Sequence, residues 1–109
     1  MASSEKSWEI ISDKAVVGSA TSCDIVITNK LISRVHCAIH KTSSGYIVED
    51  LGSKHGTFVD KKAIFRKTRV SRLEQISLSE SVQIPVQKVL EFFRSKRHKK
   101  KDQQVVFTV

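Results

Sequence analysis

The sequence predicts an all-β sandwich of two antiparallel sheets, with a short helix near its C-terminal end. Short segments rich in Val, Ile, Phe and Tyr recur about every ten residues, and polar or glycine-containing breaks separate them. No long segment with the 3.6-residue period of a helix precedes residue 85. Many short, evenly spaced strands are typical of a sandwich. The expected strands are SWEIIS, AVVGS, CDIVIT, RVHCAIHKT, GYIVEDL, GTFVD and EQISLSE, with SDK as the first break.

Side-chain alternation predicts which face of the strand RVHCAIH is buried. Successive side chains of a strand point to opposite faces. Val35, Cys37 and Ile39 therefore share one face, which we expect to be core, and the histidines on either side of Cys37 share the other. Cys37 and Cys23 both lie in apolar surroundings. We expect them to be reduced and to act as small hydrophobic residues rather than to form a disulfide.

The C-terminal third contains a proline, a helical pattern and a final apolar segment. Pro85 restricts VQIPVQ to an edge strand or a strand end, because proline cannot donate to a sheet ladder. A short helix is expected next, because Val86, Val89, Leu90 and Phe93 recur at helical spacing. The last segment, DQQVVFTV, is either one more strand or an extension that belongs to a longer parent protein.

The charge of the chain is concentrated near its C-terminal end. The net charge is +8, but the segment 94–101 alone has six of the 19 Lys and Arg residues and no acid. Residues 1–93 have 13 basic and 10 acidic residues and are nearly balanced. We therefore expect one folded domain at 1–93 and a basic tail or linker at 94–109. This distribution argues against a domain that coats nucleic acid as a whole.

The sequence leaves three hypotheses for the basic tail. The first is a solvated end without a partner, the second is a nuclear-localisation or nucleic-acid patch, and the third is a contact with an anionic membrane. The N-terminal residues show no secretory signal, and no uncharged apolar segment approaches the ~18 residues that span a bilayer. We expect the protein to be intracellular, either cytoplasmic or nuclear.

Three polar clusters, VVGS, ISRVH and GSKHGT, lie where expected strands end or begin. A sandwich brings alternate loops together at one end, so we expect these clusters to meet there. Together they offer hydroxyl groups, backbone N–H groups and cations, which are the groups that bind an anion such as phosphate. These side chains are Ser19, Ser33, Ser53, Thr57, Arg34, Lys54 and His55.

The same clusters resemble the motifs of the forkhead-associated (FHA) domain family. That family has Gly-Arg near its start, then Ser-Arg-x-His, then Ser-x-Asn-Gly-Thr before a strand. The segments VGSATSCDIVITNKLISRVHCAIH and YIVEDLGSKHGTFVDKKAI match these motifs in order and spacing. The resemblance implies a β-sandwich that binds phosphothreonine peptides through loops at one end. It implies no enzyme activity, no cofactor and no small-molecule substrate.

The resemblance also assigns roles to individual residues. Ser33 donates its hydroxyl to the phosphate, and Arg34 adds a second phosphate contact. Lys54 and His55 are displayed on the third loop beside Ser53, and all three, with Ser19, belong to the expected peptide-binding surface. The residues expected to brace these loops are Gly18, His36, Gly56 and Thr57.

The chain departs from the family pattern at two positions, where Ser19 follows the first glycine in place of arginine and His55 stands in place of asparagine. One charge-assisted hydrogen bond contributes roughly 1.5–3 kcal/mol, or about ten- to a hundredfold in affinity. Two functional hypotheses follow. The first is a phosphothreonine-peptide recognition module in signalling. The alternative is a degenerate FHA domain that acts as a phosphate-independent interaction or scaffold module with a basic tail.

Catalysis and metal binding are disfavoured by the sequence. A nucleophile–base pair of Ser33 and His36 has no third orienting group, and strand alternation sends the two side chains to opposite faces. A zinc site of His36, Cys37 and His40 has diverging ligands, because Cys37 points away from both histidines on a strand.

Overall fold

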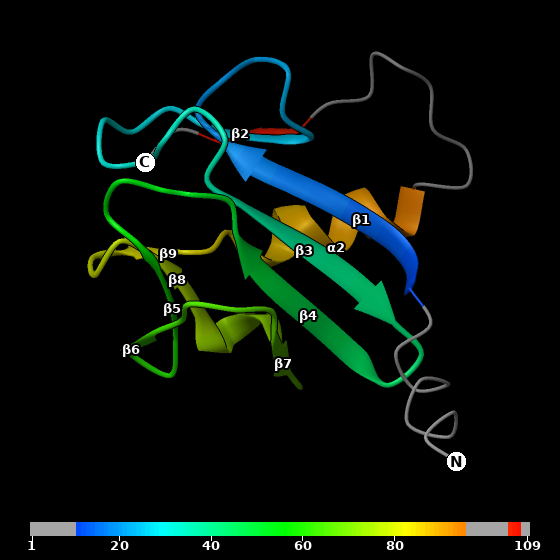
Figure 1. Cartoon of the computed structure of the whole chain (residues 1–109). Coiled ribbons are helices and arrows are strands. Elements are labelled where there is room, and N and C mark those ends of the chain that lie inside the picture. The colour runs from blue at the N-terminus through cyan, green and yellow to red at the C-terminus, as the bar shows by residue number, and fades with distance from the viewer. Residues whose placement is uncertain (1–10, 96–104, 108–109) are drawn as a thin grey trace.

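The computed structural model describes residues 11–95 and 105–107 of the 109-residue chain. Two β-sheets pack face to face, and one α-helix lies against the larger sheet (Figure 1). The larger sheet has the strand order β10–β2–β1–β3–β4–β7, and the smaller sheet has the order β6–β5–β8–β9. The predicted sandwich with a short C-terminal helix is confirmed.

The elements follow one another along the chain with short connections. The strands of the larger sheet are β1 (Ile11–Gly18), β2 (Ile25–Ile27), β3 (Cys37–Thr42), β4 (Gly45–Asp50), β7 (Thr68–Val70) and β10 (Val105–Phe107). Those of the smaller sheet are β5 (Thr57–Val59), β6 (Lys62–Ala63), β8 (Ile76–Leu78) and β9 (Val82–Gln83). A 3₁₀ helix, η1 (Leu73–Gln75), precedes β8, and the α-helix, α2 (Val86–Ser95), follows β9.

The larger sheet is mixed rather than purely antiparallel. Strand β2 pairs in parallel with β1 on one side and with β10 on the other. The pairs β1–β3, β3–β4 and β4–β7 are antiparallel, as are all pairs of the smaller sheet. The segment DQQVVFTV thus contributes a strand, at residues 105–107. The predicted domain boundary at residue 93 stays a prediction, and residues 96–101 of the basic tail lie outside the described part of the chain.

Strand β1 contains the segment SDK that the sequence suggested as a break. It runs without interruption from Ile11 to Gly18, and the pairing register with β3 shifts between Ile11 and Asp13. A bulge of this kind accommodates an extra residue while the strand continues. The prediction of two separate strands here was therefore wrong, and the first residues of SWEIIS lie outside the described residues.

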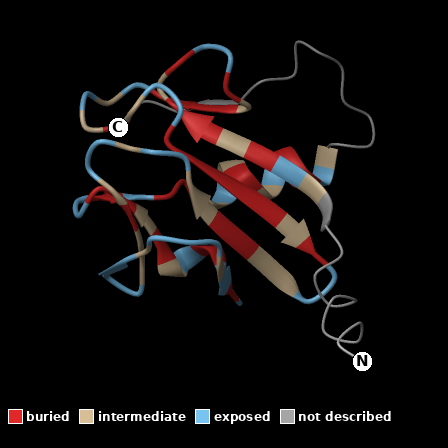
Figure 2. Cartoon of the chain, viewed as in Figure 1, coloured by how far each residue is buried: buried red, intermediate tan, exposed pale blue. Residues whose placement is uncertain are grey.

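The main apolar cluster of the core receives residues from both sheets and α2, and a smaller one is formed by Ala20, Cys23 and Val26 (Figure 2). Helix α2 contacts β1 and β2, and its Phe93 ring stacks on Tyr46 of β4 with the centroids 6.1 Å apart. Cys23 and Cys37 are both buried and free, as predicted. Burial raises the pKa of the Cys37 thiol well above its ordinary value, so this residue packs as a small apolar group.

Val35 does not face the core as alternation predicted. It is 44% exposed, whereas Cys37 and Ile39 are fully buried. Strand β3 begins only at Cys37, so Val35 lies in the preceding loop, where the two-residue period does not apply. The neighbouring His36 is fully buried instead.

Strand β9 ends the smaller sheet at one edge, and Pro85 follows it just before α2 begins. The predicted strand end at Pro85 and the predicted helix are thus both confirmed. No helix within residues 11–95 and 105–107 combines the length and apolar character that a membrane crossing requires.

Candidate functional site

Three loops come together at one end of the sandwich: residues 19–24 after β1, 28–36 before β3 and 51–56 after β4 (Figure 1). The Ser19 N–H donates to the Ser33 carbonyl at 2.9 Å, which joins the first loop to the second. The Lys54 N–H donates to the Ser33 hydroxyl oxygen at 2.8 Å, which joins the third loop to the second. The three polar clusters of the sequence therefore meet, with Ser33 at their junction.

The carboxylate of Asp50, at the end of β4, organises the third loop. One oxygen accepts the N–H groups of Gly52 and Ser53, and the other accepts the hydroxyls of Ser53 and Thr57. Burial alone would raise the pKa of Asp50, but these hydrogen bonds together outweigh it and hold the pKa below its ordinary value. The carboxylate therefore stays ionised and holds the loop in one shape.

Sequence reasoning did not identify Asp50 as part of the site. A signal for it was present, since an Asp followed two and three residues later by backbone N–H donors is typical of an Asx-turn. The sequence pattern had drawn attention to Ser53 only for its hydroxyl group. The carboxylate is therefore the main residue of the loop frame that the motifs did not reveal.

His36 connects the second loop to the third from inside the protein. Its Nδ1 accepts the Ser33 N–H at 3.1 Å, so its Nε2–H donates to the Gly56 carbonyl at 2.8 Å. Burial lowers the pKa of His36, more than its hydrogen bond to Gly56 raises it, which favours this neutral form. The Leu51 N–H also donates to the His36 carbonyl. His36 is thus bonded to both loops, as expected of a residue that braces them.

Two glycines allow the loops to approach one another. A Cβ atom on Gly18 would lie 2.1 Å from the Arg34 carbonyl oxygen, so only glycine fits where β1 meets the second loop. Gly56 has a φ of +91°, a conformation that residues with a side chain rarely adopt. Its carbonyl accepts both the His36 Nε2–H and the Ser79 N–H, so the turn after β8 is held to the same point.

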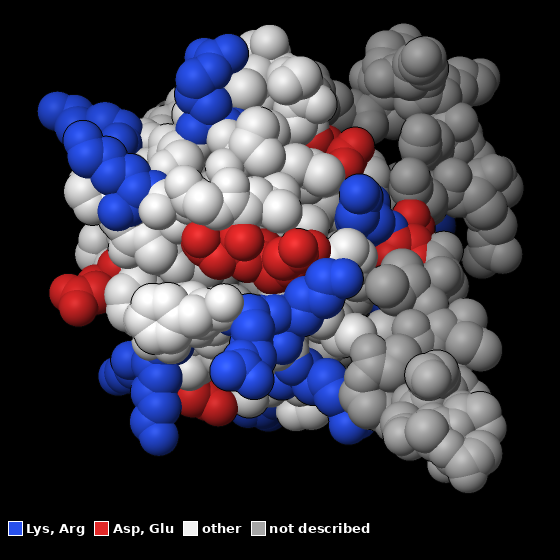
Figure 3. Space-filling view, viewed as in Figure 1, with Lys and Arg blue, Asp and Glu red and all other residues white. Residues whose placement is uncertain are grey.

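The rim of the site carries the groups that are free to meet a ligand. Arg34, Lys54 and His55 are exposed, and Ser19 and Ser33 are half-buried. The Ser33 hydroxyl accepts the Lys54 N–H, and within the described residues its own hydrogen has no acceptor. Figure 3 shows Lys and Arg side chains at this end of the molecule. The rim thus offers one hydroxyl donor and two cations.

Ser53 belongs to the frame of the loop rather than to its rim. Its hydroxyl donates to Asp50 and accepts the Gly56 N–H at 2.9 Å. The hydroxyl hydrogen is therefore already used, and in this conformation Ser53 has no donor for a phosphate. The sequence had grouped it with the peptide-binding residues.

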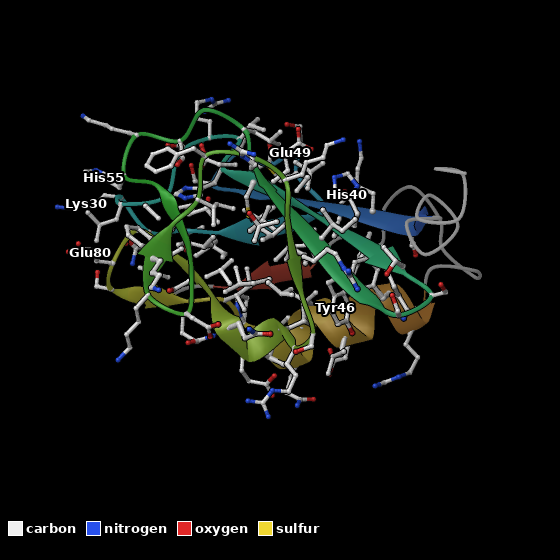
Figure 4. The ribbon with its side chains drawn as sticks, turned by 60° about the horizontal axis from the view of Figure 1, so that its bottom comes forward. Lys30, His40, Tyr46, Glu49, His55 and Glu80 are labelled. Atoms are coloured by element: carbon white, nitrogen blue, oxygen red, sulfur yellow. The ribbon has the colours of Figure 1, made fainter. Side chains whose placement is uncertain are left out.

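A shallow groove begins beside His55 and runs toward the turn between β8 and β9. Its lining residues are Leu31, His55, Phe58, Ser79, Glu80 and Ser81. Figure 4 shows Lys30, His55 and Glu80 on the same side of the molecule, away from His40 and Glu49. The groove therefore has apolar and acidic lining groups next to the basic rim.

The arrangement of Ser33 and His36 does not match a nucleophile and its base. Alternation predicted that the two side chains lie on opposite faces, but both residues lie in a loop, and His36 Nδ1 accepts the backbone N–H of Ser33. The Ser33 hydroxyl instead contacts Lys54. Within residues 11–95 and 105–107, no three His, Cys, Asp or Glu side chains are grouped as metal ligands.

The sequence profile of the FHA domain family matches residues 15–85. The chain belongs to the FHA family. The FHA domain of the CT664 protein from Chlamydia trachomatis is 30% identical, with a TM-score of 0.59 over 65% of this chain and 72% of that one. EmbR from Mycobacterium tuberculosis, solved in complex with a low-affinity phosphopeptide, is 26% identical, with a TM-score of 0.55 over 60% of this chain and 17% of EmbR.

A similar segment occurs in a much longer plant protein. A homologue of a protein phosphatase 1 regulatory inhibitor subunit from Arabidopsis thaliana is 41% identical over 51 residues. These residues make up 45% of this chain and 14% of the plant protein. The similarity therefore concerns a domain within that protein and not its overall architecture.

Proposed function

We propose that this FHA domain recognises phosphothreonine peptides of a partner protein and thereby mediates a protein–protein interaction. The observation that supports this best is the junction at Ser33, where a hydroxyl donor without an acceptor in the described structure lies between the loops of Arg34 and Lys54. A hydroxyl donor and two cations on a loop edge form the kind of site that binds a phosphate dianion.

The EmbR complex supports a phosphopeptide as the ligand, because that relative is similar in fold and above a quarter identical in sequence. The preference for threonine over serine rests on the FHA family resemblance. We infer that the domain acts by binding and not by catalysis. The proposal also implies an intracellular, cytoplasmic or nuclear setting, where protein kinases act and the two free cysteines stay reduced.

The two departures from the family pattern bear on the strength of binding. Ser19 has no charge with which to replace an arginine, and each charge-assisted hydrogen bond contributes roughly 1.5–3 kcal/mol. Arg34 and Lys54 are exposed beside the same junction and offset part of this loss. We therefore infer a site that binds phosphate more weakly than an FHA site with the arginine.

The groove beside His55 is the natural place for peptide residues that flank the phosphothreonine. It starts at the rim, and Glu80 and nearby Lys30 give its surroundings charges of opposite sign. We infer that these residues influence which flanking side chains are accepted. An oriented peptide library in which Glu80→Lys is compared with the natural protein tests this inference, since a basic preference should then turn acidic.

The test of the proposed function is a titration of the full chain with one peptide in three forms: phosphothreonine, phosphoserine and unphosphorylated. We expect the phosphothreonine form to bind at least about tenfold more tightly than the unphosphorylated form, as one charge-assisted hydrogen bond suffices for that ratio. Equal binding of all three forms would overturn the proposal and favour the phosphate-independent scaffold.

The basic tail is a separate proposal. Residues 94–101 offer six cations to a nucleic acid or an anionic membrane. Substituting these cations with glutamine should leave phosphopeptide binding unchanged, because the hydrogen bonds that hold the three recognition loops join residues between Val16 and Ser79. A loss of phosphopeptide affinity in that variant would show that the tail belongs to the recognition site.

A further inference from the structure

The near balance of charge in residues 1–93 hides a second basic region within the folded domain. Of the 13 Lys and Arg residues there, six lie between Lys61 and Arg72, a stretch that contains no Asp or Glu. Two of them, Arg66 and Lys67, lie in the loop between β6 and β7 together with Phe65, and two more, Lys61 and Lys62, lie just before that loop. We call Lys61, Lys62, Phe65, Arg66 and Lys67 the β6–β7 patch.

Every side chain of the β6–β7 patch is turned toward solvent. Phe65 is 91% exposed, compared with 44% for Val35 and 37% for Leu51, the other exposed large hydrophobic residues of the described chain. All four cations are exposed, and none forms an ion pair within the described residues. A single exposed apolar residue is ordinary, but an almost fully exposed ring among four unpaired cations is a specific combination.

The loop is anchored at both ends. The Ile64 N–H donates to the Thr57 carbonyl at 2.9 Å, and the Thr68 hydroxyl donates to the Arg66 carbonyl at 2.9 Å. Before the loop, Asp60 and Lys61 both have positive φ angles and form the tight turn between β5 and β6. The backbone therefore presents Phe65 from a fixed base.

The patch lies on a different part of the surface from the recognition loops. Figure 1 shows the connection between β6 and β7 below the loop after β4, and Figure 3 shows Lys and Arg side chains gathered in this lower region beneath a band of acidic ones. A partner at the patch and a peptide at the rim would thus meet different side chains. The inference that follows is independent of the proposed phosphopeptide function.

We propose that the β6–β7 patch docks the domain on an anionic membrane surface. Phe65 enters the boundary between headgroups and acyl chains, while Lys61, Lys62, Arg66 and Lys67 lie against the lipid phosphates and carboxylates. An apolar side chain supplies burial and the surrounding cations supply electrostatic attraction, which is the combination that holds proteins at a membrane interface.

The shape of the patch favours a membrane over a single-stranded nucleic acid. Sites for single strands combine a positively charged groove with aromatic rings on which successive bases stack. A ring that is 91% exposed stands out from the surface and lies in no groove. An exposed apolar side chain with exposed cations before and after it in the chain is complementary to a flat, anionic surface that the side chain can enter.

The decisive experiment places a fluorescent reporter at the tip of the loop. Phe65→Trp is made in a Trp8→Phe background, so that the protein has one tryptophan, and the six cations of the tail are changed to glutamine. Vesicles of phosphatidylcholine with phosphatidylserine should shift the emission to shorter wavelength, and lipids brominated near the headgroup should quench it. Pure phosphatidylcholine vesicles should do neither.

Binding to the same vesicles by sedimentation identifies the residues responsible. In the glutamine-tail background, Phe65→Ser and the pair Arg66→Glu with Lys67→Glu should each weaken binding by about tenfold or more. The matched controls are Val35→Ser and the pair Lys14→Glu with Lys30→Glu, which change exposed residues elsewhere and should stay within about twofold. Thermal melts of all variants establish that each is folded.

Two outcomes would overturn the proposal. One is vesicle binding that the patch variants leave unchanged. The other has three parts. The tryptophan emission of Phe65→Trp does not shift with anionic vesicles, poly-uridylate quenches it, and the patch variants lose affinity for that RNA. The second outcome would reassign the patch to single-stranded nucleic acid.

Discussion

The candidate site has two parts: a frame of residues that hold the loops, and an exposed rim that faces solvent. The two parts differ in whether their polar groups already have hydrogen-bond or ion-pair partners within the protein. In the frame, His36, Asp50 and Thr57 are bonded to the loops they hold, and within the described residues no buried side-chain nitrogen or oxygen lacks a partner. In the rim, Arg34 and Lys54 point to solvent and form no ion pair with described residues. The frame is therefore complete without a ligand, and the rim is not.

This difference separates residues that support the fold from residues that are free to meet a ligand. Ser19 and His55, the two positions at which the sequence was expected to depart from the family, lie on the rim, whereas His36, Gly56 and Thr57 lie in the frame. A change in the frame lowers the stability of the folded protein, because buried hydrogen bonds that form on folding are then missing. A change in the rim costs only affinity for a ligand. The following predictions test this division, from the largest expected effect to the smallest.

Asp50→Ala should lower the free energy of unfolding by about 2–3 kcal/mol, because four hydrogen bonds to its carboxylate disappear together. A decrease of this size corresponds to a fall of at least about 10 °C in the melting temperature of a domain of this length. Glu80→Ala is the control, since Glu80 is an exposed carboxylate outside the frame. An Asp50→Ala protein that melts like the Glu80→Ala control would contradict the idea of a frame organised by Asp50.

Ser19→Arg should strengthen phosphothreonine-peptide binding by about ten- to a hundredfold, since it restores one charge-assisted hydrogen bond at the rim. Ser19→Gln is the control for side-chain length without charge. Calorimetric titration of both variants with the same peptide makes the comparison. If the arginine variant binds no better than the glutamine variant, the phosphate does not lie beside residue 19.

Ser33→Ala and Arg34→Ala should each weaken phosphopeptide binding by about tenfold. Arg34→Ala should leave the melting temperature nearly unchanged because Arg34 is exposed, whereas Ser33→Ala should lower it slightly because the Lys54 N–H loses its acceptor. Val35→Ala changes the next exposed residue and serves as the control. Fluorescence anisotropy with a labelled peptide is a suitable measurement. Full affinity in the double variant would move the binding site away from this junction.

The smallest effect is a pH dependence of stability. Burial lowers the pKa of His36 below its unfolded value of 6.5, so the unfolded chain takes up a proton first as the pH falls. Stability is therefore complete above about pH 6.5 and decreases below it. The lowered pKa of Asp50 acts in the same direction, starting near its ordinary value of 3.8.

Urea denaturation between pH 7.5 and pH 5 measures this slope. His36→Gln should be less stable at pH 7 and should show a flatter dependence on pH, whereas His55→Asn, an exposed control, should retain the natural slope. Parallel curves for the natural protein and His36→Gln would show that another group is responsible.

Much of the fold was predictable because local chemistry and tertiary structure agree. The order of short apolar segments indicated the sandwich, and the spacing of Val89, Leu90 and Phe93 indicated the helix, whose apolar side then packs into the core. The site was predictable because the three polar clusters lie at strand ends, and strand ends of a sandwich share a common face.

Other features depend on contacts between residues far apart in the chain. Strands β6 and β7 have only two and three residues and show no alternation, so their pairing with β5 and β4 defines them. The exposure of Val35 depends on where β3 begins, which is at Cys37, directly after His36 has donated its N–H to the Val17 carbonyl of β1. The alternation of apolar and polar residues does not show at which residue a strand begins.

By itself, the sequence determined the fold class, the family and the chemical groups at the recognition site, because apolar spacing, glycines and polar motifs act over a few neighbouring residues. Only the tertiary structure decided what each of those groups does. It assigned Ser53 to the frame and Ser33 to the rim, although both are serines in polar loops. The physical reason is that a hydroxyl's function depends on whether its hydrogen already has an acceptor, and the acceptor of Ser53, Asp50, is brought to it by the fold of the loop.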